Sequence, residues 1–263
     1  MKTENLSKQE LMQTAQDRMK DLFKDSDLSD KQKLALTCRI LYDKGHDSGL
    51  AGQISCRGAN RNTFITQRLG LGFDEITANN LLTVDQDLQP LDGEGMANPA
   101  NRFHTWVYKE RPDVNCIVHT HPTHIAALSM LEVPLIVSHM DTTGLYEDCA
   151  FLKDWPGVPV GNEEGITISK ALGNKRSILL AHHGQLVVGE TIEEACNLAI
   201  LIERAAKLQL LAMSAGDIKP LSPEVAREAH DWVSTDRRNK VNFAYYARQA
   251  LKTHPDCIEG AYS

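Results

Sequence analysis

The stretch Cys116-Ile117-Val118-His119-Thr120-His121-Pro122 is typical of a buried β-strand that ends in two metal ligands. Side chains two residues apart on a strand lie on the same face of the sheet, so His119 and His121 point the same way. This spacing allows both imidazoles to bind one cation, and the proline ends the strand. The stretch therefore predicts one half of a metal site.

The other half is predicted by Ser177-Ile178-Leu179-Leu180-Ala181-His182-His183-Gly184, a second apolar run that ends in histidine. On a strand, His182 and His183 would point to opposite faces, so we expect only one of them to join the site. Gly184 permits a close backbone approach and weakly favours His183. Three histidines around one cation leave a coordination position open, as in a catalytic zinc site. The alternative is a set of polar strand-end residues that bind no metal.

Further histidines lie near this predicted site in the sequence. His104 is in the helix before the strand, on the same face as Asn101, and is either a catalytic residue or a buried histidine with a hydrogen-bond partner. His139 follows an expected strand over 135–137 and is a candidate proton donor, with a structural role as the alternative. For His124, a surface or helix-capping role is favoured over that of a fourth ligand. Solvent-facing positions are predicted for the others, which are His46, His230 and His254.

The composition is that of an ordinary globular protein with one sizeable core. The chain has 263 residues, of which 42% are hydrophobic and 24% are charged, and its formal net charge is −7. No basic run is present, so nucleic acid and membranes are not expected as partners, and no apolar run approaches the roughly 20 residues that span a bilayer. The polar N-terminus does not resemble a secretory signal, and the six cysteines form no CxxC motif. We therefore expect a cytoplasmic protein with free thiols.

Helix and strand patterns alternate along the chain and predict an α/β layered domain. We expect an N-terminal helical extension over residues 1–28, a main domain over 29–214 and a C-terminal helical extension over 215–263. Helical periodicity and capping residues predict helices over 8–24, 29–45, 98–110, 123–130, 162–172, 191–213, from 222 onward, and 239–251. Alternation and apolar runs predict strands over 53–57, 63–66, 81–84, 116–121, 135–137, 177–183 and 185–188. Residues 140–162 show no clear pattern.

Several motifs resemble those of the class II aldolase/adducin family. In chain order they are Gly52-Gln53-Ile54-Ser55-Cys56-Arg57, Arg111-Pro112-Asp113-Val114, His119-Thr120-His121-Pro122, His182-His183-Gly184, and Val188-Gly189-Glu190-Thr191 with Glu194-Ala195. The resemblance covers about residues 30–213. It implies a three-layer α/β/α fold with a mostly antiparallel central sheet, and homotetramers with active sites between subunits.

The resemblance also implies a metal-dependent lyase that acts on a small carbonyl compound. Its ligands would be His119, His121 and His183, and its cofactor a divalent metal, with Zn²⁺ favoured and Mn²⁺ or Mg²⁺ as alternatives. The metal polarises the carbonyl and stabilises the charge left by carbon–carbon cleavage. Candidate catalytic residues are His139, which lies near the place of a tyrosine donor in the aldolases, and His104. Candidate substrate contacts are Gln53, Ser55, Asn98, Asn101, Arg102, Asp141 and Tyr146.

The chain departs from the sugar-phosphate aldolases at the start of the helix before the Arg-Pro-Asp motif. There the aldolases that it resembles carry Ser-Ser-Glu, whereas this chain carries Asn98-Pro99-Ala100. An alanine cannot transfer a proton, and without the serines a phosphorylated substrate is not expected. We therefore predict aldol cleavage or decarboxylation of a non-phosphorylated oxo or hydroxy acid. The alternatives are a catalytically silent adducin-like scaffold and a sugar epimerase or dehydratase.

Overall fold

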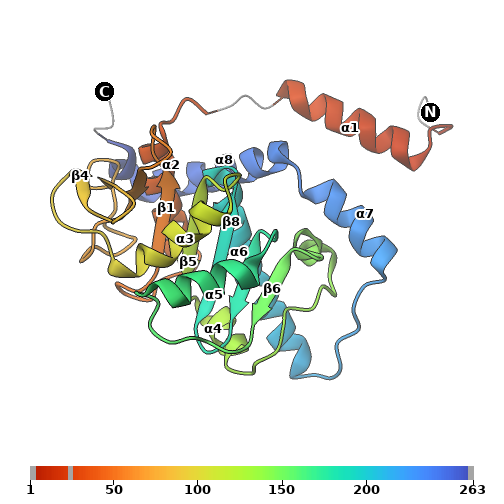
Figure 1. Cartoon of the computed structure of the whole chain (residues 1–263). Coiled ribbons are helices and arrows are strands. Elements are labelled where there is room, and N and C mark those ends of the chain that lie inside the picture. Colours follow the sequence, from red (N-terminus) through yellow and green to blue (C-terminus); the bar gives the residue numbers. More distant parts are fainter. Residues whose placement is uncertain (1–3, 23–25, 260–263) are drawn as a thin grey trace.

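An eight-stranded sheet forms the centre of the protein (Figure 1). The computed structural model describes residues 4–22 and 26–259. Across the sheet the strands follow the order β4 (Pro90–Asp92), β3 (Leu82–Val84), β2 (Phe64–Thr66), β1 (Gln53–Arg57), β5 (Cys116–Thr120), β8 (Gly184–Gly189), β7 (Ser177–Leu180) and β6 (Cys149–Leu152). Every neighbouring pair is antiparallel except β6 and β7, which are parallel. The prediction of a mostly antiparallel sheet is confirmed.

Helices cover both faces of this sheet and produce the predicted three-layer α/β/α arrangement. The α-helices are α1 (Lys8–Leu22), α2 (Asp30–Asp43), α3 (Arg102–Glu110), α4 (Thr123–Ser129), α5 (Asn162–Leu172), α6 (Ile192–Met213), α7 (Pro223–Val233) and α8 (Asp236–Thr253), and the short 3₁₀ helices are η1 (Pro99–Asn101), η2 (Met140–Leu145) and η3 (Pro255–Ile258). One face carries α3 and α5, which share a core with the strands. The other face carries α2, α4 and α6. Helix α8 packs against α2 and α6 through a further apolar cluster.

Strand β5 lies inside the sheet, and its side chains alternate between the two layers. Cys116 and Val118 belong to the core beneath α2 and α6, whereas Ile117 belongs to the core beneath α3 and α5. His119 follows on the Ile117 side, where its ring meets Phe103 of α3 edge-on, with 5.0 Å between the ring centroids. All five residues of the strand are buried. A strand buried on both faces therefore places its first histidine at the edge of the core beneath α3.

Side-chain caps start the helices close to the predicted positions. Ser29 begins α2 with a reciprocal capping box. Thr191 begins α6 by accepting the amide of Glu194, and these two residues have the spacing of a second capping box. The Glu194 carboxylate does not accept the backbone amide of Thr191, as it would in a capping box. It accepts the amide of Glu190 and pairs with Arg176 instead. An ion pair thus replaces half of the box.

The predicted strand over 135–137 is wrong. The amide of Ile136 donates to the side chain of Gln209 on α6, and the carbonyl of Val137 accepts the amide of Leu221. The flanking residues of this segment are apolar because they pack against the core beneath α6. A short apolar run looks the same in the sequence whether it is a buried strand or a buried loop, since apolar periodicity indicates burial and not backbone pairing. The unassigned residues 140–162 contain η2 and β6.

The second histidine-bearing strand is shorter than predicted. Strand β7 ends at Leu180, and residues 181–183 turn the chain toward β8. His182 has a positive φ of 57° in this turn. The alternation rule for strands therefore does not apply to His182 and His183, and the turn itself decides which of them reaches the site.

The terminal helices differ in how closely they join the domain. Helix α1 lies apart from the sheet in Figure 1, and its Lys8 forms an ion pair with Glu228 of α7. Helix α8 instead buries Phe243 and Ala247 in a cluster with Leu36 of α2. Across residues 4–22 and 26–259, no helix is long and apolar enough to cross a membrane.

Candidate metal centre

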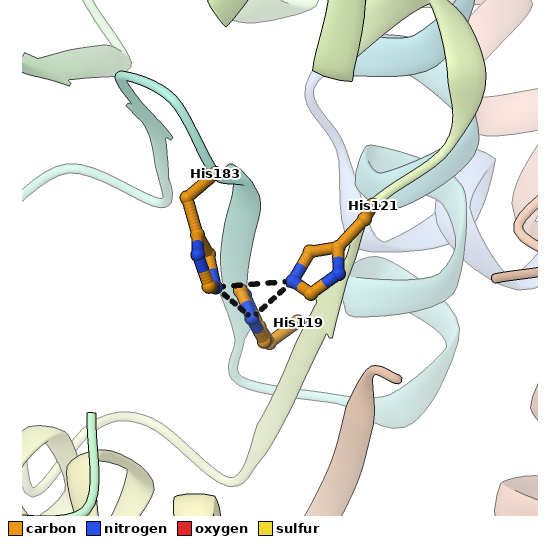
Figure 2. Close-up of side chains that lie close together, drawn as sticks. All are labelled: His119, His121 and His183. Carbon is orange, nitrogen blue, oxygen red and sulfur yellow. Dashed lines mark hydrogen bonds between the residues drawn. The ribbon is translucent and has the colours of Figure 1, made fainter. Parts of the chain in front are cut away.

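Three histidines from β5, the residue after it and the β7–β8 turn converge on one point (Figure 2). The Nε2 atom of His119 lies 2.8 Å from Nε2 of His121 and 3.0 Å from Nε2 of His183, and the last two atoms are 3.0 Å apart. Within the part of the chain that the structure describes, these side chains form a group able to hold a metal ion. The structure thus brings together the three histidines that the sequence suggests as ligands.

The environment of the three rings suits a cation. Nδ1 of His119 lies 2.8 Å from the backbone oxygen of Gln185, so Nδ1 carries the proton and Nε2 presents a lone pair. Three Nε2 atoms in a triangle cannot all be satisfied by hydrogen bonds, because each bond needs one proton and one lone pair on a common line. Nitrogens bound tetrahedrally to zinc lie roughly 3.3 Å apart, which is close to the spacing found here. The residues therefore fit a divalent metal with one coordination position left open.

Burial keeps the three rings in the neutral form that binds a metal. It lowers the pKa of His183 to about 3 and also lowers the pKa of His121. It holds the pKa of His119 well below its usual range, and the neighbouring His121, His183 and His104 add to that effect. Neutral imidazole is the ligand form, so these rings need to lose no proton near neutral pH.

Gly184 allows the ends of β5 and β8 to meet at this point. A Cβ atom at Gly184 would lie 2.6 Å from the carbonyl oxygen of Thr120 and 2.7 Å from Cδ2 of His121. Only a residue without a side chain leaves this space to the His121 ring. The close approach expected from the sequence is therefore present, and it is made to the His-x-His pair itself.

A polar cluster on the opposite face of β5 supports the same strand end. Thr120 Oγ1 lies 2.9 Å from Nδ1 of His46 and accepts a hydrogen bond of 2.9 Å from the Gln185 side chain. Gln185 thus holds Thr120 through its side chain and His119 through its backbone oxygen. His46 is buried, and its predicted solvent-facing position is wrong, because Gly45 turns the chain back toward the sheet at the end of α2.

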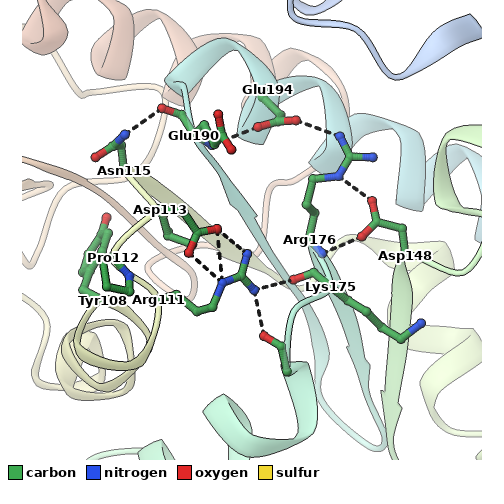
Figure 3. A network of polar contacts seen from close by, with 12 residues as sticks. Tyr108, Arg111, Pro112, Asp113, Asn115, Asp148, Lys175, Arg176, Glu190 and Glu194 are labelled. Atoms are coloured by element: carbon green, nitrogen blue, oxygen red, sulfur yellow. Dashed lines mark hydrogen bonds and ion pairs between the residues drawn. The ribbon is translucent and has the colours of Figure 1, made fainter. Parts of the chain in front are cut away.

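At the other end of β5, an ion-pair network joins the strand to its neighbours (Figure 3). Arg111 pairs with Asp113 at 2.6 Å and donates to two backbone carbonyls just before β7. This arginine holds the pKa of Asp113 below its ordinary value. Arg176, just before β7, lies between the carboxylates of Asp148 and Glu194. The Arg-Pro-Asp motif therefore anchors the beginning of the strand whose other end carries the histidines.

Two of the other predicted site residues lie beside the three histidines. Gln53 faces His119 across the β1–β5 pair, and its buried Oε1 has no hydrogen-bond partner among the described residues. Nδ1 of His104 lies 2.7 Å from Oγ of Ser55, and within the same residues its buried Nε2 has no partner. Burial lowers the pKa of His104 to about 3. Gln53 and His104 thus each keep a polar atom unused, whereas Ser55 is engaged in the interior.

The predicted contacts at the start of α3 have partners within the subunit. Asn98 caps η1 through its side chain. Asn101 is buried and donates to the hydroxyl of Thr66 at 2.9 Å. Arg102 lies 3.6 Å from the carboxylate of Asp87. None of the three forms a hydrogen bond with the metal-site histidines in the described parts of the chain.

The predicted contacts around η2 are also engaged elsewhere. His139 caps η2 by accepting the amide of Asp141, and its side chain is 56% exposed. Asp141 pairs with Arg204 at 2.7 Å, and the guanidinium of Arg227 lies 5.4 Å from the ring centre of Tyr146. Within one subunit, the described contacts do not join these residues to the three histidines.

The remaining histidines lie outside the centre. Nδ1 of His124 is 2.5 Å from the Glu203 carboxylate, at the start of α4. His182 is exposed and lies 2.9 Å from Glu132. The side chain of His230 is 23% exposed, and that of His254 is 20% exposed.

The sequence patterns do not indicate Trp155, which touches the centre as Phe103 does. The indole of Trp155 stacks on His183, with 4.0 Å between the ring centroids and 20° between the planes. Trp155 lies in the segment 153–161 between β6 and α5, where no pattern was visible. A tryptophan in a loop rich in proline and glycine is the signal that could have pointed to it.

Known proteins resemble this chain in sequence and in structure. A protein of Streptomyces roseochromogenus subsp. oscitans, named 4-hydroxy-3-prenylphenylpyruvate oxygenase/4-hydroxy-3-prenylbenzoate synthase, is 32% identical over 201 residues, covering 75% of this chain and 73% of that protein. The 3,4-dihydroxyphthalate decarboxylase of Arthrobacter keyseri is 31% identical over 199 residues, covering 71% and 79%. The structure of the L-fuculose 1-phosphate aldolase from Glaciozyma antarctica PI12 superposes with a TM-score of 0.81 at 28% identity, covering 87% and 91%.

The family match spans most of the chain. The model described as Class II Aldolase and Adducin N-terminal domain matches residues 32–210. This range contains the whole sheet, the three histidines and the ion-pair network around Arg111. The chain therefore belongs to the class II aldolase and adducin family.

Proposed function

We propose that this lyase of the class II aldolase type decarboxylates a non-phosphorylated oxo or hydroxy acid, with a divalent metal held by His119, His121 and His183. The lyase class follows from the family and from relatives named as decarboxylases and aldolases. One observation carries the finer proposal. Three histidines able to hold a metal ion converge, whereas Ala100 stands where the resemblance to the aldolases places the glutamate that moves protons.

Decarboxylation needs an electron sink and then one proton. In a 3-oxo acid, the bond to the carboxylate breaks, its electron pair moves into the carbonyl at carbon 3, and carbon dioxide leaves. A hydroxy acid can react in this way when its hydroxyl-bearing carbon can become such a carbonyl by tautomerisation. The electron pair then returns to carbon and takes a proton from a donor. A divalent metal at the centre supplies Lewis acidity that stabilises the negative charge developing on the carbonyl oxygen. Because the leaving group is carbon dioxide, no base is needed at Ala100.

Two histidines are candidates for the proton donor. His104 lies beside the centre in the same subunit, and Nδ1 is held by Ser55, which also contacts the hydroxyl of Tyr108 at 3.0 Å. Burial lowers the pKa of His104 to about 3, so the neutral ring would donate from Nε2, which has no partner among the described residues. His139 lies at an exposed helix start, where it would be available to the active site of a neighbouring subunit. Gln53, beside His119, would hold the substrate through its unused amide oxygen or its amide nitrogen.

The proposal includes the metal, the assembly and the location. Zinc is favoured because three neutral imidazoles with an open position form a common catalytic zinc site, and manganese or magnesium are alternatives. A homotetramer with active sites between subunits is supported by exposed apolar side chains after α4 and on α6, which are Met130 (64% exposed), Leu131 (50%) and Leu211 (60%). A cytoplasmic location is supported by six cysteines that form no disulfide.

The test compares two histidines that lie close together. The metal content of the purified full-length protein is measured for the wild type, His121→Ala and His182→Ala. We expect about one equivalent of divalent metal in the wild type and in His182→Ala, and less than about a tenth in His121→Ala, because a site with two ligands binds far more weakly. No metal in the wild type, or the same content in His121→Ala, refutes the proposal.

The reaction is tested with a panel of oxo and hydroxy acids, with carbon dioxide and aldehyde products measured. Release of carbon dioxide that depends on the bound metal is expected. The assay is run with and without oxygen, because one relative is named an oxygenase. Aldehyde without carbon dioxide would indicate aldol cleavage instead. Neither metal nor product would favour the adducin-like scaffold, and conversion of a sugar derivative would favour an epimerase or dehydratase.

A further inference from the structure

The indole of Trp155 continues the stack of rings at the metal centre. Its ring lies 4.0 Å from that of His183 at 20°, and the His183 ring lies 4.9 Å from that of His119 at 11°. The indole therefore stacks on the ring of His183, one of the three histidines whose Nε2 atoms converge. Trp155 is partly buried against the core beneath α3 and α5, and this packing fixes the position of its ring.

The indole N–H is free to bind something else. Within the described residues, Nε1 of Trp155 makes no hydrogen bond, and it is not among the polar atoms sealed from solvent. Indole N–H groups that are partly buried usually have a partner. A donor at the rim of a metal site, with an aromatic face beside it, suits a ligand that is both flat and anionic.

The residues that follow Trp155, over 156–160, are glycine, proline and valine, and most of them are exposed. Val158 is 74% exposed and Val160 is 51% exposed in the same loop. A site built for a phosphorylated sugar needs cations and hydroxyl donors, and residues 155–161 offer neither. The cation just before them, Lys153, pairs with Glu132. The chemistry of the loop instead favours a substrate with an apolar surface.

We propose that Trp155 is a specificity-determining residue, which forms an aromatic wall beside the open coordination position and selects aromatic acids over aliphatic ones. The inference rests on the proposed function, because it names the substrate class of the same site. An aromatic acid bound to the metal through its carboxylate presents its ring to the indole. Aromatic pairs of this kind contribute beyond their buried area, whereas an aliphatic acid of the same charge gains no such contact.

The position of the indole is tested by fluorescence of the full-length protein during titration with Co²⁺, which quenches indole emission at short range. The chain has three tryptophans. We expect one equivalent of Co²⁺ to quench the wild type, and most of that quenching to disappear in Trp155→Phe. Trp232→Phe, which changes the tryptophan of α7, is the matched control and should retain the quenching by Co²⁺. Equal quenching in wild type and Trp155→Phe overturns the placement.

Selectivity is tested by the binding of two acids to the Co²⁺-loaded protein, followed through the visible spectrum of the metal. In both salicylate and 3-hydroxybutyrate, the hydroxyl group is on the carbon adjacent to the one that bears the carboxylate. Only salicylate is aromatic. We expect salicylate to bind more tightly to the wild type. Trp155→Leu should weaken salicylate about three- to tenfold and leave 3-hydroxybutyrate unchanged, and Trp155→Phe should retain the preference.

The outcomes separate this inference from the proposed function. Equal binding of the two acids by the wild type, or an equal loss for both in Trp155→Leu, overturns the aromatic wall, as does a spectrum that neither acid changes. The measurement needs no turnover. A protein that binds salicylate through Trp155 but releases carbon dioxide from no acid would therefore keep the inference and refute the decarboxylase.

Discussion

Replacing Gly184 with alanine is expected to disturb the metal centre without removing a ligand. The new methyl group would lie 2.6 Å from the carbonyl oxygen of Thr120 and 2.7 Å from Cδ2 of His121, whereas ordinary contacts begin at 3.4 Å. Both groups must retreat by roughly 0.7 Å to reach normal van der Waals separation. Because Thr120 pairs with Gln185 in the β5–β8 ladder, that retreat also opens the end of the ladder.

The expected magnitude has two parts. Overpacking of a rigid site costs about 1–3 kcal/mol of unfolding free energy. Movement of the His121 ring additionally weakens the metal site, and disturbances of groups that orient ligands typically cost about 10- to 100-fold in metal affinity. The two effects can be measured separately, because the overpacking cost is present without metal and the loss of metal affinity is not.

Two measurements check this prediction. Urea unfolding in the presence of a chelator reports the overpacking cost alone. Competition with a fluorescent zinc chelator reports the dissociation constant of the metal. Far-UV circular dichroism confirms that the variant is folded under the conditions of the competition experiment.

A glycine elsewhere provides the control. At Gly144 in η2, a new methyl group would have its nearest contact at 3.0 Å with Cδ2 of Leu201, the end of a flexible side chain. Gly144→Ala should cost less than about 1 kcal/mol and leave the metal affinity unchanged. If Gly184→Ala binds zinc as tightly as the wild type, the argument that this glycine makes room for His121 is refuted.

Two further predictions concern stability. Arg176→Ala leaves the carboxylates of Asp148 and Glu194 without their partner, and urea unfolding should show a loss of about 3–5 kcal/mol; a loss below about 1 kcal/mol would show that solvent satisfies them. Burial lowers the pKa of His46 and His104 from 6.5 to about 3. As the pH falls below 6.5, these two histidines are protonated in the unfolded chain but not in the folded protein. The free energy of unfolding therefore falls between pH 6.5 and about 3, by about 1.4 kcal/mol per pH unit for each histidine. His46→Gln should remove one such contribution from the slope of unfolding free energy against pH, and an unchanged slope contradicts the assignment.

The regular elements near the site follow from local patterns. The apolar run before His119 predicts β5 because both faces of that strand are buried. The cap residues Ser29 and Thr191 predict helix starts because they satisfy free amides from a neighbouring position. Such signals need no knowledge of the rest of the fold.

Other parts depend on contacts between distant segments. The run at 135–137 is apolar for packing and not for strand pairing, and Gln209 of α6 decides its backbone partner. His46 is buried only because Thr120, 74 residues later, lies against it. Neither sequence neighbourhood contains this information.

The His-x-His pair and the family motifs can be recognised without the structure, since each depends on residue identity at short spacing. Strand alternation leaves the choice between His182 and His183 open, and the family resemblance favours His183; the folded chain shows the physical reason, because the turn after β7 sets the direction of both side chains. The tertiary structure alone placed Trp155 on His183. A ligand set is assembled by strand pairing between residues more than 60 positions apart, and only the folded backbone brings those positions together.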